Sequence, residues 1–273
     1  MRKIPLAALL LAASASPGFC AGYDDLNAAI SYFNQAQYDN AITWFDKALA
    51  AGDLIPDQVR IAHLDRGEAY MHKGNGQKGL EDFSAAIAAK PDDPMAYRNR
   101  AAIYIALNER AKALADYQKL RELRPRNLNT LMNIGWLNWQ LGNFEEAAKD
   151  FKLFALIDRY SWLWLQLANV RLGRPMDDFS EDVASRKWPG QVARFFRGHL
   201  SESDVLDAAA ATGDADSICA GHILTGLWRV VHGDQAGAAP LFQAAKAKCP
   251  STSAYQHIAD SELEKTVSAE KRQ

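Results

Sequence analysis

The sequence predicts an all-α fold, a superhelical solenoid of about five to six helix–turn–helix units with a C-terminal capping helix. The main observation is a 34-residue period between about Arg60 and Arg159, in which a small residue and large apolar or aromatic side chains recur. The small residue lets two helices approach closely, the rings fill the gap to the next unit, and proline suits the break between units. Clusters of turn-forming residues separate the periodic segments. The recurring positions in three successive units are Gly67, Tyr70, Phe83, Ala86 and Pro91; Ala101, Tyr104, Tyr117, Leu120 and Pro125; and Gly135, Asn138, Phe151, Phe154 and Arg159.

The period and its residue pattern resemble the tetratricopeptide repeat, a helix–turn–helix unit of the same length. We expect four units over residues 23–161. The first helix pair runs from Tyr23 to Ala50, with Ala29 at the close-contact position, and a longer connection at 53–56 follows it. The internal turns of the next three units are expected at Lys73–Gly76, Asn108–Arg110 and Gly142–Phe144.

The repeat phase weakens after Asp158 and returns near the C-terminus. Residues 162–218 predict an irregular, degenerate region, with helices at 162–172, around Phe195 and Phe196, and at 202–211. Residues 219–265 predict one more unit and a capping helix, and residues 266–273 a disordered tail. In this unit Gly226 takes the close-contact position and Phe242 the ring position.

The N-terminal residues 1–22 read as a secretory signal peptide. Arg2 and Lys3 precede an apolar run from Ile4 to Ala13, and small residues follow. The run is too short to span a membrane. Without the leader, basic residues fall from 31 to 29 against 33 acidic ones, so the net charge becomes about −4. A nucleic-acid partner would usually leave a basic footprint, so none is expected.

The sequence allows two cleavage points for this leader. Cleavage after Gly22 places Cys20 and Gly22 at the two small-residue positions, whereas cleavage after Ala21 leaves bulky Phe19 at one of them. Cys20 also raises a lipid anchor as an alternative, although the residues before it lack the character of a lipobox. We therefore expect a periplasmic protein, with an outer-membrane lipoprotein as the alternative.

Cys219 and Cys249 fall at positions 1 and 31 of the last unit, the start of its first helix and the end of its second. Because the two helices of a unit are antiparallel, those ends lie side by side. In an oxidising compartment this placement predicts a disulfide. The alternative is two small apolar residues in a repeat interior.

Motifs of catalysis and metal binding do not occur in the sequence: it contains no Gly-rich phosphate loop, His-Glu-x-x-His, Cys-x-x-Cys or Gly-x-Ser-x-Gly. We expect no enzyme, cofactor, metal or small-molecule substrate. The rival hypothesis is an envelope enzyme with its site in 174–218. The residues there that could carry chemistry are Asp177, Asp178, Glu181, Asp182 and His199, without a known spacing.

The resemblance implies a binding face, since in tetratricopeptide arrays the first helix of each unit lines the concave groove and its sixth position points inward. Three of the four residues there are asparagine, whose amide both donates and accepts hydrogen bonds and so can pair with a peptide backbone. The alternative is that these asparagines are merely solvated. The sixth positions are Asn27, Asp65, Asn99 and Asn133, and the neighbouring groove positions are Leu64, Glu68, Arg98, Met132 and Trp136.

Four tryptophans, Trp136, Trp139, Trp162 and Trp164, gather near the end of the regular repeats. They predict either an exposed contact site or part of the core. The core is favoured because aromatic stripes at helical spacing are usually buried.

A closer resemblance is to the NlpI-type periplasmic tetratricopeptide-repeat proteins. It rests on the leader, the repeats, the irregular middle and a late segment: Trp188-Pro189, Phe195, Gly198, Leu227, Gly233-Asp234, Ala238, Leu241-Phe242 and Ala245. It implies an envelope adaptor, often dimeric, that presents proteins to a periplasmic protease or to cell-wall enzymes. We therefore expect a non-catalytic scaffold that binds a protein or peptide in its concave groove. A structural subunit of an outer-membrane assembly or secretion machine is a second rival.

Overall fold

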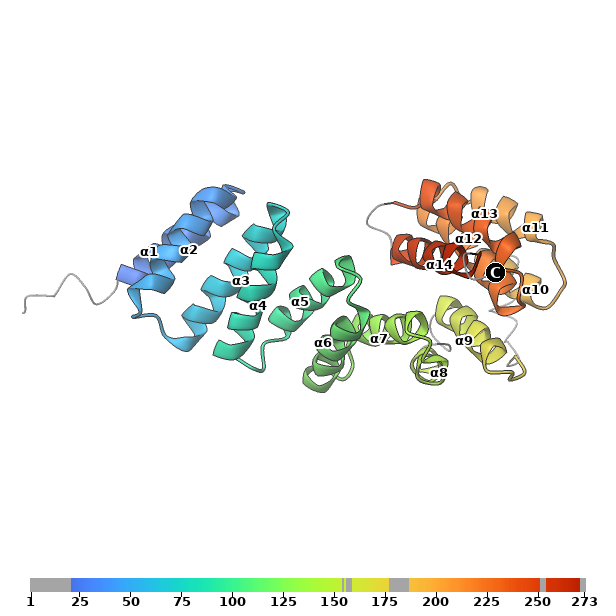
Figure 1. Ribbon diagram of the computed structural model, residues 1–273, viewed down its shortest axis with the longest axis horizontal. Coiled ribbons are helices and arrows are strands. Elements are labelled where there is room, and N and C mark those ends of the chain that lie inside the picture. The colour runs from blue at the N-terminus through green and yellow to red at the C-terminus, as the bar shows by residue number, and fades with distance from the viewer. Residues whose placement is uncertain (1–20, 154, 156–158, 177–186, 251–253, 271–273) are drawn as a thin grey trace, which may run out of the picture. The chain divides into compact units, whose positions relative to one another are not determined.

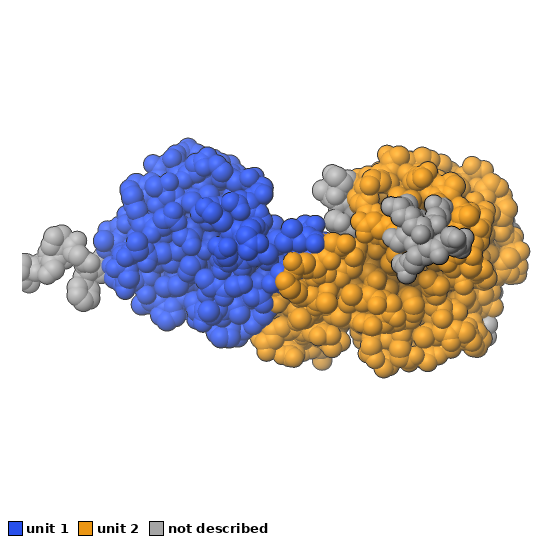
Figure 2. All heavy atoms as spheres, viewed as in Figure 1, with its two compact units in different colours: residues 1–107 blue, residues 108–273 orange. Residues whose placement is uncertain are grey.

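The computed structural model describes residues 21–153, 155, 159–176, 187–250 and 254–270, and all regular structure within them is α-helical (Figure 1). The chain divides into two compact units, residues 1–107 and 108–273 (Figure 2). The helices of the first unit are α1 (Ala21–Asn34), α2 (Tyr38–Ala51), α3 (Pro56–His72), α4 (Gly76–Ala89) and α5 (Pro94–Ala106). Those of the second unit are α6 (Arg110–Leu123), α7 (Leu128–Gln140), α8 (Phe144–Lys152), α9 (Arg159–Arg171), α10 (Gly190–Phe196), α11 (Glu202–Ala210), α12 (Ala215–Val231), α13 (Gln235–Lys248) and α14 (Ala254–Glu270).

Helix pairs with a small residue facing a ring form the repeating element of both units. In the first unit α1 packs against α2 and α3 against α4. A Cβ added to Gly67 would lie 2.8 Å from Cε1 of the fully buried Phe83. A Cβ added to Gly135 would lie 2.9 Å from Cε1 of Phe151, and one added to Gly226 would lie 2.6 Å from Cε1 of Phe242. The close approach predicted from the 34-residue period is therefore confirmed within three helix pairs, and glycine is needed there for space.

The turns within the repeats also fall where the sequence places them. Asn75 precedes α4 and its side chain accepts a hydrogen bond from the backbone of Lys78. Gly74 and Gly142 adopt positive φ angles of 74° and 80°, which glycine adopts without the steric penalty of a Cβ. Asn108 takes the same left-handed conformation, with φ of 60°, between α5 and α6.

The second unit is organised around α12, which contacts α9, α10, α11, α13 and α14. In Figure 1, α12, α13 and α14 lie side by side. One hydrophobic cluster joins residues of α7, α8 and α9 to residues of α10 to α14. The irregular region and the C-terminal repeat therefore share a core.

Tryptophans contribute to this core as the favoured alternative predicts. Trp139, Trp162 and Trp164 are all at most 5% exposed. Trp136 is half-buried, with its ring 4.6 Å from that of Trp164 and 5.4 Å from that of Tyr255 in α14. The exposed-contact alternative is therefore wrong for these four side chains.

The predicted disulfide is present. Cys219 lies in the first turns of α12, Cys249 directly follows α13, and their Cα atoms are 4.9 Å apart. Since α12 packs against α13, the bond joins the start of the first helix to the end of the second, as the repeat positions predict.

The C-terminal helix differs from the expectation. α14 continues to Glu270, five residues past the predicted end at Lys265. The added residues, Thr-Val-Ser-Ala-Glu, contain no glycine or proline that would end a helix. Residues 271–273 lie outside the described part, as does most of the predicted leader.

Candidate functional site

The first helices of the repeats in unit 1 are neighbours, because α3 contacts both α1 and α5. Three of the predicted groove residues lie on them: Asn27 on α1, Asp65 on α3 and Asn99 on α5. Asn27 is exposed, while Asp65 and Asn99 are half-buried. We call the surface formed by these residues with Glu68 and Arg98 the α1/α3/α5 face.

Two polar contacts fix α5 against α3. Asn99 Nδ2 donates a hydrogen bond to Glu68 Oε1 at 2.6 Å. Arg60 Nη1 lies 2.6 Å from Oδ2 of Asp93, the residue that caps α5 and accepts a hydrogen bond from the backbone of Met95. Both contacts link helices far apart in sequence, so this part of the face is organised before any partner arrives.

Among the carboxyl groups of the face, Asp65 has the pKa that lies furthest from its ordinary value. Burial, together with the nearby charge of Glu68, raises the pKa of Asp65 to about 6, and Arg60 offsets this only in part. Its side chain makes no hydrogen bond or ion pair within the described part of the chain. A cation or hydrogen-bond donor from outside would therefore find an unused acceptor there.

The exposed Arg98 guanidinium likewise makes no ion pair among the residues that the structure describes. The face thus presents two amides, two carboxyl groups and one guanidinium. Such a mixture suits an extended polypeptide, which offers both donors and acceptors along its backbone.

Leu64 is a correction to the predicted groove. It is only 5% exposed and packs in a core cluster with Leu80 and Phe83. Successive helical residues point about 100° apart, so the neighbour of a groove position can face the interior. Leu64 therefore stabilises the α3–α4 pair and is not available to a partner.

The remaining predicted residues, Met132, Asn133 and Trp136, lie on α7 in unit 2 and are half-buried. Because tyrosine and tryptophan rings of α14 and α9 cover Trp136, its ring serves the core of that unit. These three residues belong to unit 2, so they are not part of the α1/α3/α5 face of unit 1.

A buried aspartate behind the face was not singled out from the sequence. Asp82 of α4 is 3% exposed and binds two residues of α3, with Oδ1 at 2.8 Å from His63 Nδ1 and Oδ2 at 2.9 Å from Arg66 Nε. Burial acts to raise the pKa of Asp82, but the hydrogen bonds from His63 and Arg66 outweigh it and hold the pKa below its usual range. The available signal was the period itself, since steps of 34 residues reach Asp116 and Asp150, which are also buried.

The rival catalytic region is only partly described. Asp177, Asp178, Glu181 and Asp182 lie outside the described residues, and His199 is exposed after α10. Within the described ranges, no group of three or more His, Cys, Asp or Glu side chains could hold a metal ion. No helix there has both the length and the apolar character needed to cross a membrane.

Comparison with known proteins agrees with the helix-pair geometry. The family profile of the tetratricopeptide repeat matches residues 26–94 and 98–159. Residues 26–94 and 98–159 belong to the tetratricopeptide-repeat family. A tetratricopeptide repeat protein from Parabacteroides merdae has the same fold over 90% of this chain and 99% of its own, with a TM-score of 0.58 and 18% identity.

The chain spans less than a fifth of the length of the curated relatives that it matches. DnaJ homolog subfamily C member 3 of Bos taurus is 32% identical over 90 residues, which are 33% of this chain and 18% of that protein. RNA polymerase II-associated protein 3 of Mus musculus is 29% identical over 116 residues, 42% of this chain and 17% of that protein. Tetratricopeptide repeats are generally protein-interaction scaffolds, and this chain has that architecture.

Proposed function

We propose that this tetratricopeptide-repeat protein is a non-catalytic adaptor of the bacterial cell envelope that binds an extended segment of a partner protein on its α1/α3/α5 face. The observation that carries the proposal is a row of polar side chains that have no side-chain partner in the described part of the chain: Asn27, Asp65 and Arg98 project from three adjacent first helices. The Asn99–Glu68 and Arg60–Asp93 contacts support a preorganised surface, which reduces the ordering that binding requires.

The chemistry of the face limits which partner segments could bind to it. Asp65 and Glu68 carry carboxyl groups on one helix, three positions apart, and Asp65 forms no ion pair with any cation among the described residues. A lysine or arginine of the bound segment would supply that cation, and an acidic residue would suit Arg98. We therefore propose a segment in which a basic side chain faces α3 and the backbone runs past Asn27.

The envelope location is supported by the leader-like residues 1–22 and by the Cys219–Cys249 bond, since disulfides persist in oxidising compartments. A more specific proposal is that the adaptor presents other proteins to a periplasmic protease or to a cell-wall enzyme. It rests on the resemblance to NlpI-type proteins.

A display selection of peptides of about 15 residues on the purified, oxidised protein tests the function. We expect recovered sequences to be enriched in lysine or arginine. Their capture should fall in the variant Asn27→Ala/Asp65→Asn. The matched control is Asn40→Ala/Glu81→Gln, which makes the same kinds of change at exposed positions of the second helices α2 and α4. Equal capture by all three proteins would refute the face as the binding surface.

A further inference from the structure

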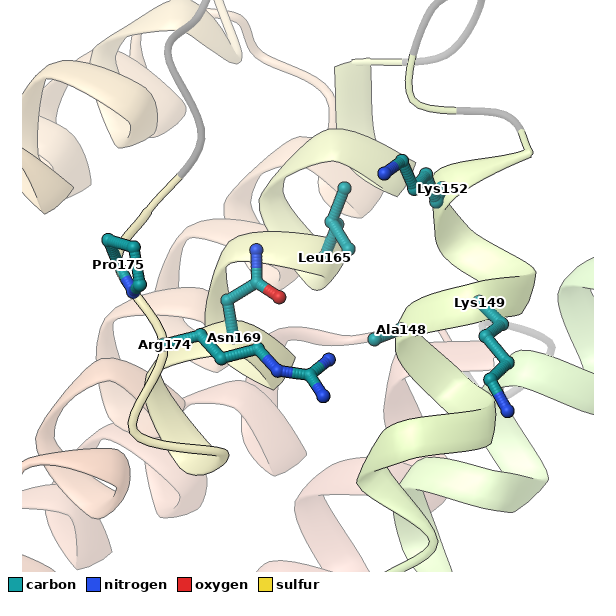
Figure 3. A pocket seen from close by; sticks show the side chains of 7 residues that line it. All are labelled: Ala148, Lys149, Lys152, Leu165, Asn169, Arg174 and Pro175. Carbon is teal, nitrogen blue, oxygen red and sulfur yellow. The ribbon is translucent and has the colours of Figure 1, made fainter.

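A second polar site lies in unit 2, away from the predicted groove residues. A cavity of about 330 Å³ opens between α8, α9 and the segment that follows α9 (Figure 3). This volume is at the lower end of the range for small-ligand pockets, which is roughly 300–1,000 Å³. It suits a group the size of one or two amino-acid residues.

The local sequence shapes one wall of this cavity. Gly173 has a φ of 67°, its N–H donates to the Val170 carbonyl at 3.0 Å, and the Arg174 N–H donates to the Asn169 carbonyl at 2.8 Å. These are the two hydrogen bonds of a Schellman C-cap, which turns the chain back at the helix end. The turn brings Arg174 beside the last turns of α9 and opposite α8.

The floor of the cavity combines apolar contact with one unused amide. Ala148 and Leu165 are 5% and 4% exposed. Asn169 is 6% exposed, and its side chain makes no hydrogen bond within the described residues. Figure 3 shows this amide directed into the space between α8 and α9. An amide side chain both donates and accepts hydrogen bonds, so the site favours a ligand that offers both an acceptor and a donor.

Positive charge gathers at the rim. Lys152 makes no ion pair among the described residues, whereas Lys149 Nζ lies 2.7 Å from Glu146 Oε1 and Arg174 Nη2 lies 2.6 Å from Glu145 Oε2. The rim therefore carries three cations against two carboxylates, and the unpaired one is Lys152. Its ammonium group favours an anion.

We propose that this cavity binds a carboxylate carried on a short apolar group, with the carboxylate at Lys152, the apolar part on Ala148 and Leu165, and Asn169 hydrogen-bonding the atoms between them. The C-terminal residue of a polypeptide and a free short-chain carboxylic acid share this chemistry. Asn169 favours the former, because a peptide group offers both an N–H and a carbonyl to one amide side chain.

The test is a titration of the full-length protein followed by NMR of backbone and side-chain amides. The probes are N-acetyl-leucine, its uncharged analogue N-acetyl-leucinamide, and hexanoate. We expect N-acetyl-leucine to shift the Ala148 backbone and Asn169 side-chain signals and the leucinamide to bind at least about tenfold more weakly. Tighter binding of N-acetyl-leucine than of hexanoate supports the polypeptide source, and equal binding supports the free acid. Equal affinity for the acid and the leucinamide would overturn the proposal, as would the absence of shifts at both residues.

Lys152→Gln provides the charge test, because the side chain is exposed and its loss leaves the core intact. We expect it to weaken N-acetyl-leucine binding about tenfold. The matched control is Lys119→Gln on α6, which makes the same charge change at an exposed ion pair that does not line the cavity. Equal weakening by both variants would mean that overall charge, and not this site, governs binding.

Discussion

Where glycine takes the close-contact position of a repeat, one neighbouring ring leaves no room for a larger residue. At Gly67 the ring belongs to Phe83, which is fully buried and has no solvent-facing side into which to move. We expect Gly67→Ala to destabilise the protein by about 1–3 kcal/mol through overpacking, despite the gain in helix propensity. Urea unfolding measures this difference.

Gly76→Ala is the control for that experiment. A Cβ there would lie 3.5 Å from Ile103, an ordinary van der Waals contact, and Gly76 begins α4. It should be neutral or slightly stabilising because alanine restricts the unfolded chain. Equal loss of stability in both variants would contradict the role given to Phe83.

The raised pKa of Asp65 predicts that the stability of the protein depends on pH. Its folded pKa, about 6, lies above its ordinary 3.8, so folding favours the protonated form. The stability that this group contributes is fully present below pH 3.8 and is lost as the pH rises through about 6. Asp65→Asn should therefore raise the urea midpoint at pH 8 and change it little at pH 3.5.

Asp57→Asn serves as a control, because the pKa of Asp57 is shifted in the opposite direction to that of Asp65. The hydrogen bond and charge of Lys90 hold the pKa of Asp57 below its ordinary value, so its contribution is present at high pH and lost in acid. A similar effect of the two substitutions at pH 8 would contradict the raised pKa of Asp65.

Individual residues were predictable where the repeat sets their position. Gly67 and Phe83 follow from the period, and so do Asn27, Asp65 and Asn99 on successive first helices. The burial of Leu64 did not follow, because its direction depends on how α3 rotates against α4. Nor could the 34-residue step alone reveal that Asn99 and Glu68 bond to each other.

At the scale of elements, the disulfide joins the two helices of the last repeat. Its closed loop, with a sequence separation of 30 residues, corresponds to roughly 3–4 kcal/mol of stability in the chain-entropy model. Cys219→Ser should lower stability by about that amount. Hydrogen exchange should accelerate first in α12 and α13, because repeats are stabilised mainly by their neighbours.

Thiol titration of the unfolded protein checks the bond itself. Without reductant, Cys219 and Cys249 should not react, and both should react after reduction. Two reactive thiols before reduction would contradict the bond. Unchanged exchange in Cys219→Ser would contradict its role in holding the last repeat.

Helices and their turns were largely predictable, since turn-forming residues separate amphipathic segments of constant spacing. The α8–α9 cavity could not be predicted from the sequence. It depends on the Schellman cap at Gly173 and on which of several charged side chains have partners, and these are features of packing where the period ends.

For the whole molecule, we expect export, and of the two cleavage points that the sequence leaves open we infer the one after Ala21, which shortens the expected leader from residues 1–22 to 1–21. The Gly22 nitrogen lies 3.3 Å from Asp53 Oδ2, so this cleavage would place a new α-amino group beside a carboxylate. Cleavage after Gly22 would remove that contact. Mass spectrometry of the envelope fraction should find a chain that begins at Gly22, and an intact Met1 form in the cytoplasm would contradict export.

The central claim is that the α1/α3/α5 face binds an extended, basic segment of a partner protein. Calorimetric titration of a selected peptide tests it most directly, with wild type compared to Asn27→Ala/Asp65→Asn and to the control Asn40→Ala/Glu81→Gln. At pH 8 the first variant should lose about one to two orders of magnitude in affinity, because each lost hydrogen bond contributes roughly 0.5–1.5 kcal/mol, or more when charged. The control should bind as wild type does, and wild-type affinity should fall as the pH drops below about 6 and Asp65 takes up a proton. Unchanged affinity in a first variant whose melting temperature shows it folded would contradict the claim.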